Sequence, residues 1–170
     1  MFHVTVLSSK GFDYNQQKKL DSSIAKFEAV MNTDELKFRV LNFRCPIGER
    51  FEKNLGLTNE QVFNKLWAGE ESYLPGSNHT ADLYLVLKKQ WKNPFSKNQP
   101  IGYSNLLEKE IYMYSWWFNN AEEYELAGHI AHEWAHKLGF EHTDVPTPLT
   151  NCSVPVAFGK IVEELVKGVK

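Results

Sequence analysis

Between residues 132 and 142, three histidines, the glutamate after the first of them and one glycine stand at spacings suited to a metal hydrolase. The segment reads HEWAHKLGFEH. His132 and His136 are four residues apart, so on a helix they lie on one face about one turn from each other and can reach one metal ion. Gly139 follows where a glycine can end the helix in a left-handed conformation, and the returning chain carries His142 toward the same ion. The spacing therefore predicts a three-histidine metal site.

Glu133 adds a candidate base to this site. Three protein ligands with an open fourth position are typical of catalytic zinc, and a carboxylate beside them suits the general base that takes a proton from a zinc-bound water. Gly139 and His142 supply most of the specificity, because solvated helix faces often carry histidines and glutamates. We expect Zn²⁺ as the cofactor, with Glu133 as the catalytic residue. The expected metal ligands are His132, His136 and His142.

Two other residues near this segment are candidates for a role at the metal. His129 lies three residues before His132 and projects near the same helix face, which makes it a rival ligand. In that case the ion would lie one turn earlier and lose His142, so a surface or supporting role is favoured. Asp144 could orient an imidazole through its ring N–H, and capping of a loop is the alternative.

The surrounding residues predict the helix that carries the histidines, from about 121 to 138. Asn120 is the expected N-cap, and Glu123 is placed for a capping box. Apolar residues recur at every fourth position on a different face from the histidines and should face the core. They are Leu126, Ile130, Trp134 and Leu138.

The rest of the chain predicts one α+β domain. A strand at 3–7, a helix at 14–30 and a second strand at 36–43 would form a unit with parallel sheet neighbours. The other expected elements are a helix from 58 to Gly69, strands at 81–87 and 111–117, an exposed loop at 91–102 and a last helix at 155–167. If the strand near 111–115 forms the edge of the cleft, an extended substrate could pair with it.

Composition and charge favour a monomer without nucleic acid or membrane partners. The 170 residues suffice for one well-buried domain, and 19 basic residues nearly balance 21 acidic ones. The only lysine clusters are Lys18-Lys19 and Lys88-Lys89, and no apolar run is long enough to span a bilayer. The first seven residues lack the basic leader and cleavage site of a signal peptide. We therefore expect a cytoplasmic protein by default, or a secreted one whose leader has been removed.

The extended HExxHxxGxxH segment resembles the signature of the metzincin clan of zinc peptidases, and the order of expected elements is similar to the metzincin plan across nearly the whole chain. The resemblance implies a mixed twisted sheet with two long helices in an upper subdomain at about 1–139. A small, mostly irregular lower subdomain at about 140–170 would end in the C-terminal helix. It also implies zinc-dependent hydrolysis of peptide bonds in a peptide or protein substrate. Residues 145–158 resemble in placement the wall of the primed-side specificity pocket.

The chain departs from the metzincin pattern downstream of the third histidine. Metzincins have a methionine in a tight turn beneath the metal, and this chain has no methionine after Met113. We expect the segment Asn151–Val156, which contains Ser-Val-Pro, to replace that turn. No tyrosine follows Tyr124, so the tyrosine that some metzincin families place near the zinc is also missing. The subfamily and the substrate preference therefore stay open.

The two cysteines, Cys45 and Cys152, do not form a disulfide framework. Free thiols are the simpler expectation, and a single bridge is the alternative. The segment Phe43-Arg44-Cys45-Pro46 faintly resembles the inhibitory cysteine segment of matrix metalloproteinases, in which a thiolate occupies the open zinc position. Such segments precede the catalytic domain, whereas Cys45 follows an expected strand within it.

The residues leave two alternatives to a zinc endopeptidase. One is a zinc-stabilised binding module without catalysis, although a structural site needs no carboxylate at the position of Glu133 and usually closes its fourth position. The other is a zinc amidohydrolase that acts on a non-peptide amide. A peptidase needs a cleft that is open at both ends.

Overall fold

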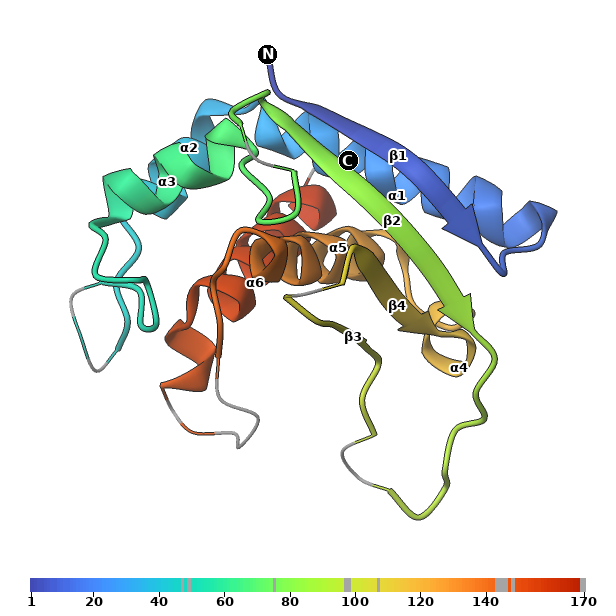
Figure 1. Cartoon of the computed structure of the whole chain (residues 1–170). Helices are drawn as coiled ribbons and strands as arrows, with labels where there is room; N and C mark the ends of the chain where they lie inside the picture. Colours follow the sequence, from blue (N-terminus) through green and yellow to red (C-terminus); the bar gives the residue numbers. More distant parts are fainter. Residues whose placement is uncertain are drawn as a thin grey trace.

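The structure is a computed structural model. It describes the chain except for residues 47, 49, 75, 97, 98, 107, 143–146, 148, 169 and 170. The elements are β1 (His3–Lys10), α1 (Tyr14–Met31), α2 (Asp34–Leu41), α3 (Asn59–Ala68), β2 (Thr80–Lys88), β3 (Gly102–Ser104), β4 (Glu110–Tyr114), α4 (Ser115–Phe118), α5 (Glu123–Lys137), the 3₁₀ turn η1 (Thr150–Cys152) and α6 (Val154–Gly168). Figure 1 shows their arrangement.

The strands form one mixed sheet in the order β1-β2-β4-β3. β1 pairs with β2 and β2 with β4 in parallel, whereas β3 runs antiparallel to β4. The α+β class and the mixed sheet are thus confirmed. The condition that the strand near 111–115 forms the edge of the cleft is not met, because β4 is paired on both sides and the edge strand next to it is β3. Three residues, Gly-Tyr-Ser, are too few to give a strand pattern in the sequence.

Helices α1, α5 and α6 pack together with the sheet in one core (Figure 1). In β4 the side chains alternate, because Ile111 and Met113 are buried while Tyr112 and Tyr114 are half-exposed. The apolar stripe expected on α5 is buried at all four positions, Leu126, Ile130, Trp134 and Leu138. This stripe anchors α5 in the core and leaves its other face available for the histidines.

Helix boundaries follow local capping. α3 begins after Thr58, whose hydroxyl accepts from the backbone of Gln61 in a capping box, and it ends at Gly69 in the left-handed conformation. α5 begins later than expected, because Glu122 rather than Asn120 is its N-cap. The amide of Asn120 instead donates to the carbonyl of Trp116 and closes α4. The strand expected at 111–117 accordingly ends at Tyr114.

The strand expected at 36–43 is helix α2, which is the main error in the predicted fold. Thr33 caps this helix through its hydroxyl, and Leu36 and Val40, four residues apart, face the core. A short run of β-branched and aromatic residues fits a strand or a helix, and tertiary packing decides between them. The parallel partner of β1 is therefore β2 and not residues 36–43.

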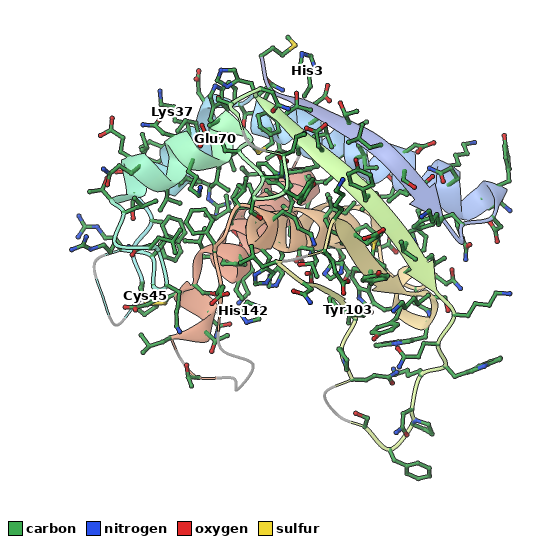
Figure 2. The ribbon with its side chains drawn as sticks, in the orientation of Figure 1. His3, Lys37, Cys45, Glu70, Tyr103 and His142 are labelled. Atoms are coloured by element: carbon green, nitrogen blue, oxygen red, sulfur yellow. A yellow bond between two sulfur atoms is a disulfide. The ribbon has the colours of Figure 1, made fainter. Side chains whose placement is uncertain are left out.

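Cys45 and Cys152 form a disulfide, with 5.4 Å between their Cα atoms (Figure 2). The expectation of free thiols was wrong, and so was the idea that Cys45 could occupy the metal position as a thiolate. Beside the disulfide, the backbone N–H of Glu52 donates to the carbonyl of Cys152 at 2.9 Å, and Glu52 forms an isolated parallel bridge with Ser153. The disulfide thus joins the segment after α2 to the segment that leads into α6. A separation of 107 residues hides such a pairing from sequence patterns.

No helix in the described parts of the chain combines the length and apolar character that crossing a membrane requires.

Candidate metal centre

The end of α5 brings the third histidine back toward the first two. The helix closes with Gly139 at φ 90°, while the backbone N–H of Phe140 reaches back to the carbonyl of Ala135 at 3.3 Å. The chain reverses direction at this glycine, as its place in the sequence predicts. His142 follows on the returning segment.

The three expected ligands converge in space. One ligand atom from each of His132, His136 and His142 lies within 4.8 Å of the other two. The Nε2 atoms of His132 and His142 are 3.2 Å apart. The centroids of the three rings lie 4.8 to 5.1 Å from one another. Among the described residues, this is the group of three whose arrangement suits a metal ion.

Backbone carbonyls orient two of these rings. Nδ1 of His136 lies 2.8 Å from the carbonyl oxygen of Phe140, which can only accept, so this nitrogen carries the proton. The backbone of Pro155 acts to raise the pKa of His132, as an acceptor beside the ring does, and proline has only its carbonyl to offer because it lacks an N–H. In the neutral rings, Nε2 then presents a lone pair toward the shared space.

A small divalent cation fits this donor set. Tetrahedral zinc with bonds of 2.0–2.1 Å to nitrogen places neighbouring donor atoms about 3.3 Å apart, close to the 3.2 Å between the Nε2 atoms of His132 and His142. Burial and the neighbouring His136 lower the pKa of His132 well below its ordinary value, which keeps this ring in the neutral form that metals bind. Imidazole nitrogens suit zinc, copper, iron and nickel, so the donor set by itself does not single out zinc.

Glu133 stands at the edge of this group. Its Oε1 is 4.0 Å from Nε2 of His132, and the residue is 5% exposed. Burial raises the pKa of Glu133 to about 7, while the Ser104 hydroxyl and the Lys137 ammonium both act to lower it. A carboxyl group with a pKa near neutrality is suited to accept and return a proton.

His129 is not a member of the group that converges. Its ring packs edge-on against Trp117 with 4.8 Å between centroids, and its centroid lies 6.4 Å from that of His132. Burial lowers its pKa to about 3, so the ring is neutral. Nδ1 of His129 lies 3.8 Å from Oε1 of Glu133. This geometry favours a supporting role over that of a rival ligand.

The histidines line a cleft of about 1120 Å³. Figure 2 shows His142 and Tyr103 on opposite sides of it. Its walls come from the start of β3, the histidine face of α5, the segment 140–142 and the first turns of α6. Gly102 in β3 lies so close to His129 that a Cβ at this glycine would come within 2.5 Å of Nε2 of His129. The edge strand thus lies directly beside the histidine face of α5.

Two residues that support the site were not expected from the sequence. Ser104 donates to the backbone carbonyl of Glu133 at 3.3 Å. The buried ammonium of Lys137 donates to the carbonyls of Asn105, Glu108 and Glu110 at 2.7–2.9 Å, in the turn that joins β3 to β4. Only Lys137 carried a signal, since a lysine beside an expected metal ligand on an otherwise apolar helix end is unusual.

The remaining predictions near the site have mixed outcomes. Asp144 lies outside the described residues, as do 145, 146 and 148 of the expected pocket wall. Val156 does line the cleft. The segment Asn151–Val156 forms η1 and the start of α6, and its Pro155 contacts His132. This contact places the segment beside the histidines, where the missing methionine turn was expected.

Comparison with known proteins gives no further guide, because no family model, curated protein or solved structure matches this chain.

Proposed function

We propose that the protein is a zinc-dependent endopeptidase. The observation that carries the proposal is the convergence of His132, His136 and His142 within 4.8 Å, with the Glu133 carboxylate 4.0 Å from Nε2 of His132. The group lies in a cleft rather than in a closed shell of ligands. No fourth histidine, cysteine or acidic residue joins the three in the described parts of the chain, which favours a catalytic over a structural site.

Each residue of the site would have its own role in peptide hydrolysis. His132, His136 and His142 would hold the ion, which when bound supplies a Lewis acid that polarises the carbonyl and makes water more acidic. Glu133 would accept the proton of the attacking water through its carboxylate and return it to the leaving amine. The Ser104 hydroxyl, which donates to the backbone carbonyl of Glu133 and acts to lower the pKa of its carboxyl group, would help to hold this residue in place.

The edge strand β3 offers a backbone for an extended substrate. The N–H of Tyr114 donates to the carbonyl of Ile101 at 2.9 Å, and donors alternate along an antiparallel pair. The backbone groups of residues 101 and 103 therefore form hydrogen bonds with β4. The backbone N–H and C=O groups of Gly102 and Ser104 then face the open edge of the sheet. A peptide that adds to this edge would pair with Gly102 and Ser104 and lie along the histidine face of α5.

The proposal includes membership of the metzincin clan in an atypical form. The extended histidine motif and the antiparallel edge strand beside the catalytic helix support it. The segment Asn151–Val156 would replace the methionine turn, with the Pro155 carbonyl orienting His132 and the Cys45–Cys152 disulfide fixing the segment from behind.

The proposal is tested by incubating the full chain with a peptide library and identifying the products by mass spectrometry. The chain is assayed as purified, after removal of metal by a chelator, and after zinc is restored. We expect internal cleavage that is lost on chelation and recovered with zinc. Zinc bound one to one without any cleavage would favour a binding module. Release of small acyl or amine groups with peptide bonds intact would favour an amidohydrolase.

A further inference from the structure

The loop that follows β2 presents two aromatic side chains to solvent. Trp91 is 93% exposed and Phe95 is 94% exposed. Residues 88–96, here called the aromatic loop, are exposed at every position. Figure 1 shows that the chain between β2 and β3 extends well away from the sheet and the helices. Tryptophan and phenylalanine are rarely this exposed without a partner, since they carry the largest apolar surfaces.

Hydrogen bonds within the aromatic loop and from Gln99 hold the loop in this exposed conformation. The Gln99 side chain accepts from the N–H of Asn93 at 2.6 Å and donates to the carbonyl of Trp91 at 3.0 Å. It thus connects the chain that leaves β2 to the chain that returns toward β3. The side chain of Asn93 accepts from the N–H of Phe95 at 3.0 Å, which forms a local turn. The exposure of both aromatic side chains is thus a property of a folded loop.

The charge of the aromatic loop is uniformly positive. Lys88, Lys89 and Lys92 belong to it, and the sequence has no acidic residue from 83 to 107, although the whole chain carries a net charge of −2. Lys92 lies over the ring of Trp116, with 5.7 Å from Nζ to the centroid. Exposed tryptophan and phenylalanine side chains that are flanked by lysines match the requirements of the surface of an anionic bilayer. The rings enter the headgroup region, and the ammonium groups meet the lipid phosphates and carboxylates.

We propose that the aromatic loop docks this protein on the surface of a membrane that contains anionic lipids, with Trp91 and Phe95 inserted at the interface. This proposal departs from the expectation of no membrane partner, which rested on lysine clusters and spanning segments. The same connection continues through Pro100 and Ile101 into the wall of the histidine cleft. Docking would therefore hold the cleft close to the membrane surface.

Single-stranded nucleic acid also binds surfaces that carry aromatic and basic residues, but it needs free ring faces for base stacking. At the base of the loop, Tyr103 and Tyr112 stack on each other with 4.7 Å between centroids. Nζ of Lys88 lies 4.0 Å from the centroid of Tyr112. These contacts cover ring faces at the base of the loop, so only Trp91 and Phe95 would be left for base stacking, and two exposed apolar rings beside lysines favour lipid.

Sedimentation with vesicles tests the proposal. The full chain is mixed with large unilamellar vesicles of phosphatidylcholine alone, or of phosphatidylcholine with roughly one-third phosphatidylserine. We expect binding to the mixed vesicles only. Trp91→Ala/Phe95→Ala should weaken the partition coefficient at least about tenfold, since the apolar insertion is lost. Lys89→Gln/Lys92→Gln should lower the partition coefficient by a similar factor. High salt should lower the partition coefficient of the wild type to that of this lysine variant.

The matched control is Tyr14→Ala/Phe38→Ala, which removes two exposed aromatic side chains from α1 and α2 and should bind like the wild type. All variants should unfold at the wild-type temperature, because the substituted residues are exposed. Equal binding to both kinds of vesicle, or unchanged binding of the two loop variants, would overturn the proposal. Binding of a single-stranded oligonucleotide without binding to vesicles would overturn it too. Vesicle binding is measured without any hydrolysis, so it stands or fails independently of the peptidase proposal.

Discussion

At the scale of single residues, the sequence predicted which side chains meet, while the groups that orient them had to come from the fold. The spacing of His132, His136 and His142 was sufficient because helical geometry and one glycine determine their convergence. The carbonyl partners of His132 and His136 lie in Pro155 and Phe140, and backbone acceptors leave no residue-type signal.

Replacement of the proposed ligands should separate His142 from His129. His142→Ala should weaken zinc binding by more than about 100-fold. Loss of a residue that only supports a ligand typically lowers metal affinity about 10- to 100-fold, and loss of the ligand itself should cost more. His129→Ala should have a smaller effect, because its ring lies outside the group of three. Competition with a chromogenic chelator measures both affinities. The reverse order would mean that His129 is the third ligand.

Glu71 gives a pH-dependent prediction. One of its carboxylate oxygens accepts from Nε1 of Trp134 at 2.6 Å and from the N–H of Asp82 at 3.0 Å. The other oxygen is buried and has no hydrogen-bond partner among the described residues. Burial raises the pKa of Glu71, so its protonated form is favoured in the folded state. This contribution to stability is fully present below the unfolded-state pKa of about 4.3 and is lost as the pH rises through the folded-state value.

Glu71→Gln should therefore change the free energy of unfolding little near pH 4 and stabilise the protein increasingly toward pH 8, because the amide keeps an acceptor for Trp134 without a buried charge. Urea unfolding at several pH values measures this difference. The exposed neighbour Glu70, replaced by glutamine, should show no such trend. A stabilisation that is the same at every pH would contradict the assignment.

At the scale of elements, patterns with a clear period or cap were predicted and short ambiguous segments were not. The cap of α3 and the stripe of α5 have the expected residues at the expected places. α2 was mistaken for a strand, and β3, the element that borders the cleft, was not predicted as a strand at all. Both are short, so their structure follows from tertiary pairing rather than from local preference.

Lys137 links α5 to the edge strand β3, because its ammonium donates to three backbone carbonyls between β3 and the start of β4. Lys137→Met keeps the apolar stem but leaves these carbonyls without their donor, which should lower the free energy of unfolding by about 3 kcal/mol. β3 should also lose its position beside Glu133, so activity should fall more than zinc binding. Lys18→Met, at an exposed lysine of α1, is the control and should alter neither quantity. Unchanged stability of the Lys137 variant would contradict this role.

At the scale of the whole molecule, the disulfide closes a loop of more than one hundred residues and joins the segment after α2 to the segment before α6. Closing such a loop stabilises a protein by about 2–5 kcal/mol. Cys45→Ser/Cys152→Ser should lower the free energy of unfolding by that amount, and a reductant should lower the unfolding temperature of the wild type but not of the variant. Because Cys152 lies three residues before Pro155, the variant should also bind zinc more weakly. An unchanged zinc affinity would show that the disulfide does not help to position the site.

The central claim is that one zinc ion bound by the three histidines acts together with Glu133 to cleave peptide bonds. The most direct measurement is the cleavage rate per bound zinc of the wild type, Glu133→Gln and the control Glu70→Gln, on a peptide that the wild type cleaves. We predict one zinc per chain in all three proteins, a rate that falls by about 100-fold or more in Glu133→Gln, and a wild-type rate in Glu70→Gln. Equal rates in the wild type and Glu133→Gln, at equal zinc content, would contradict the account.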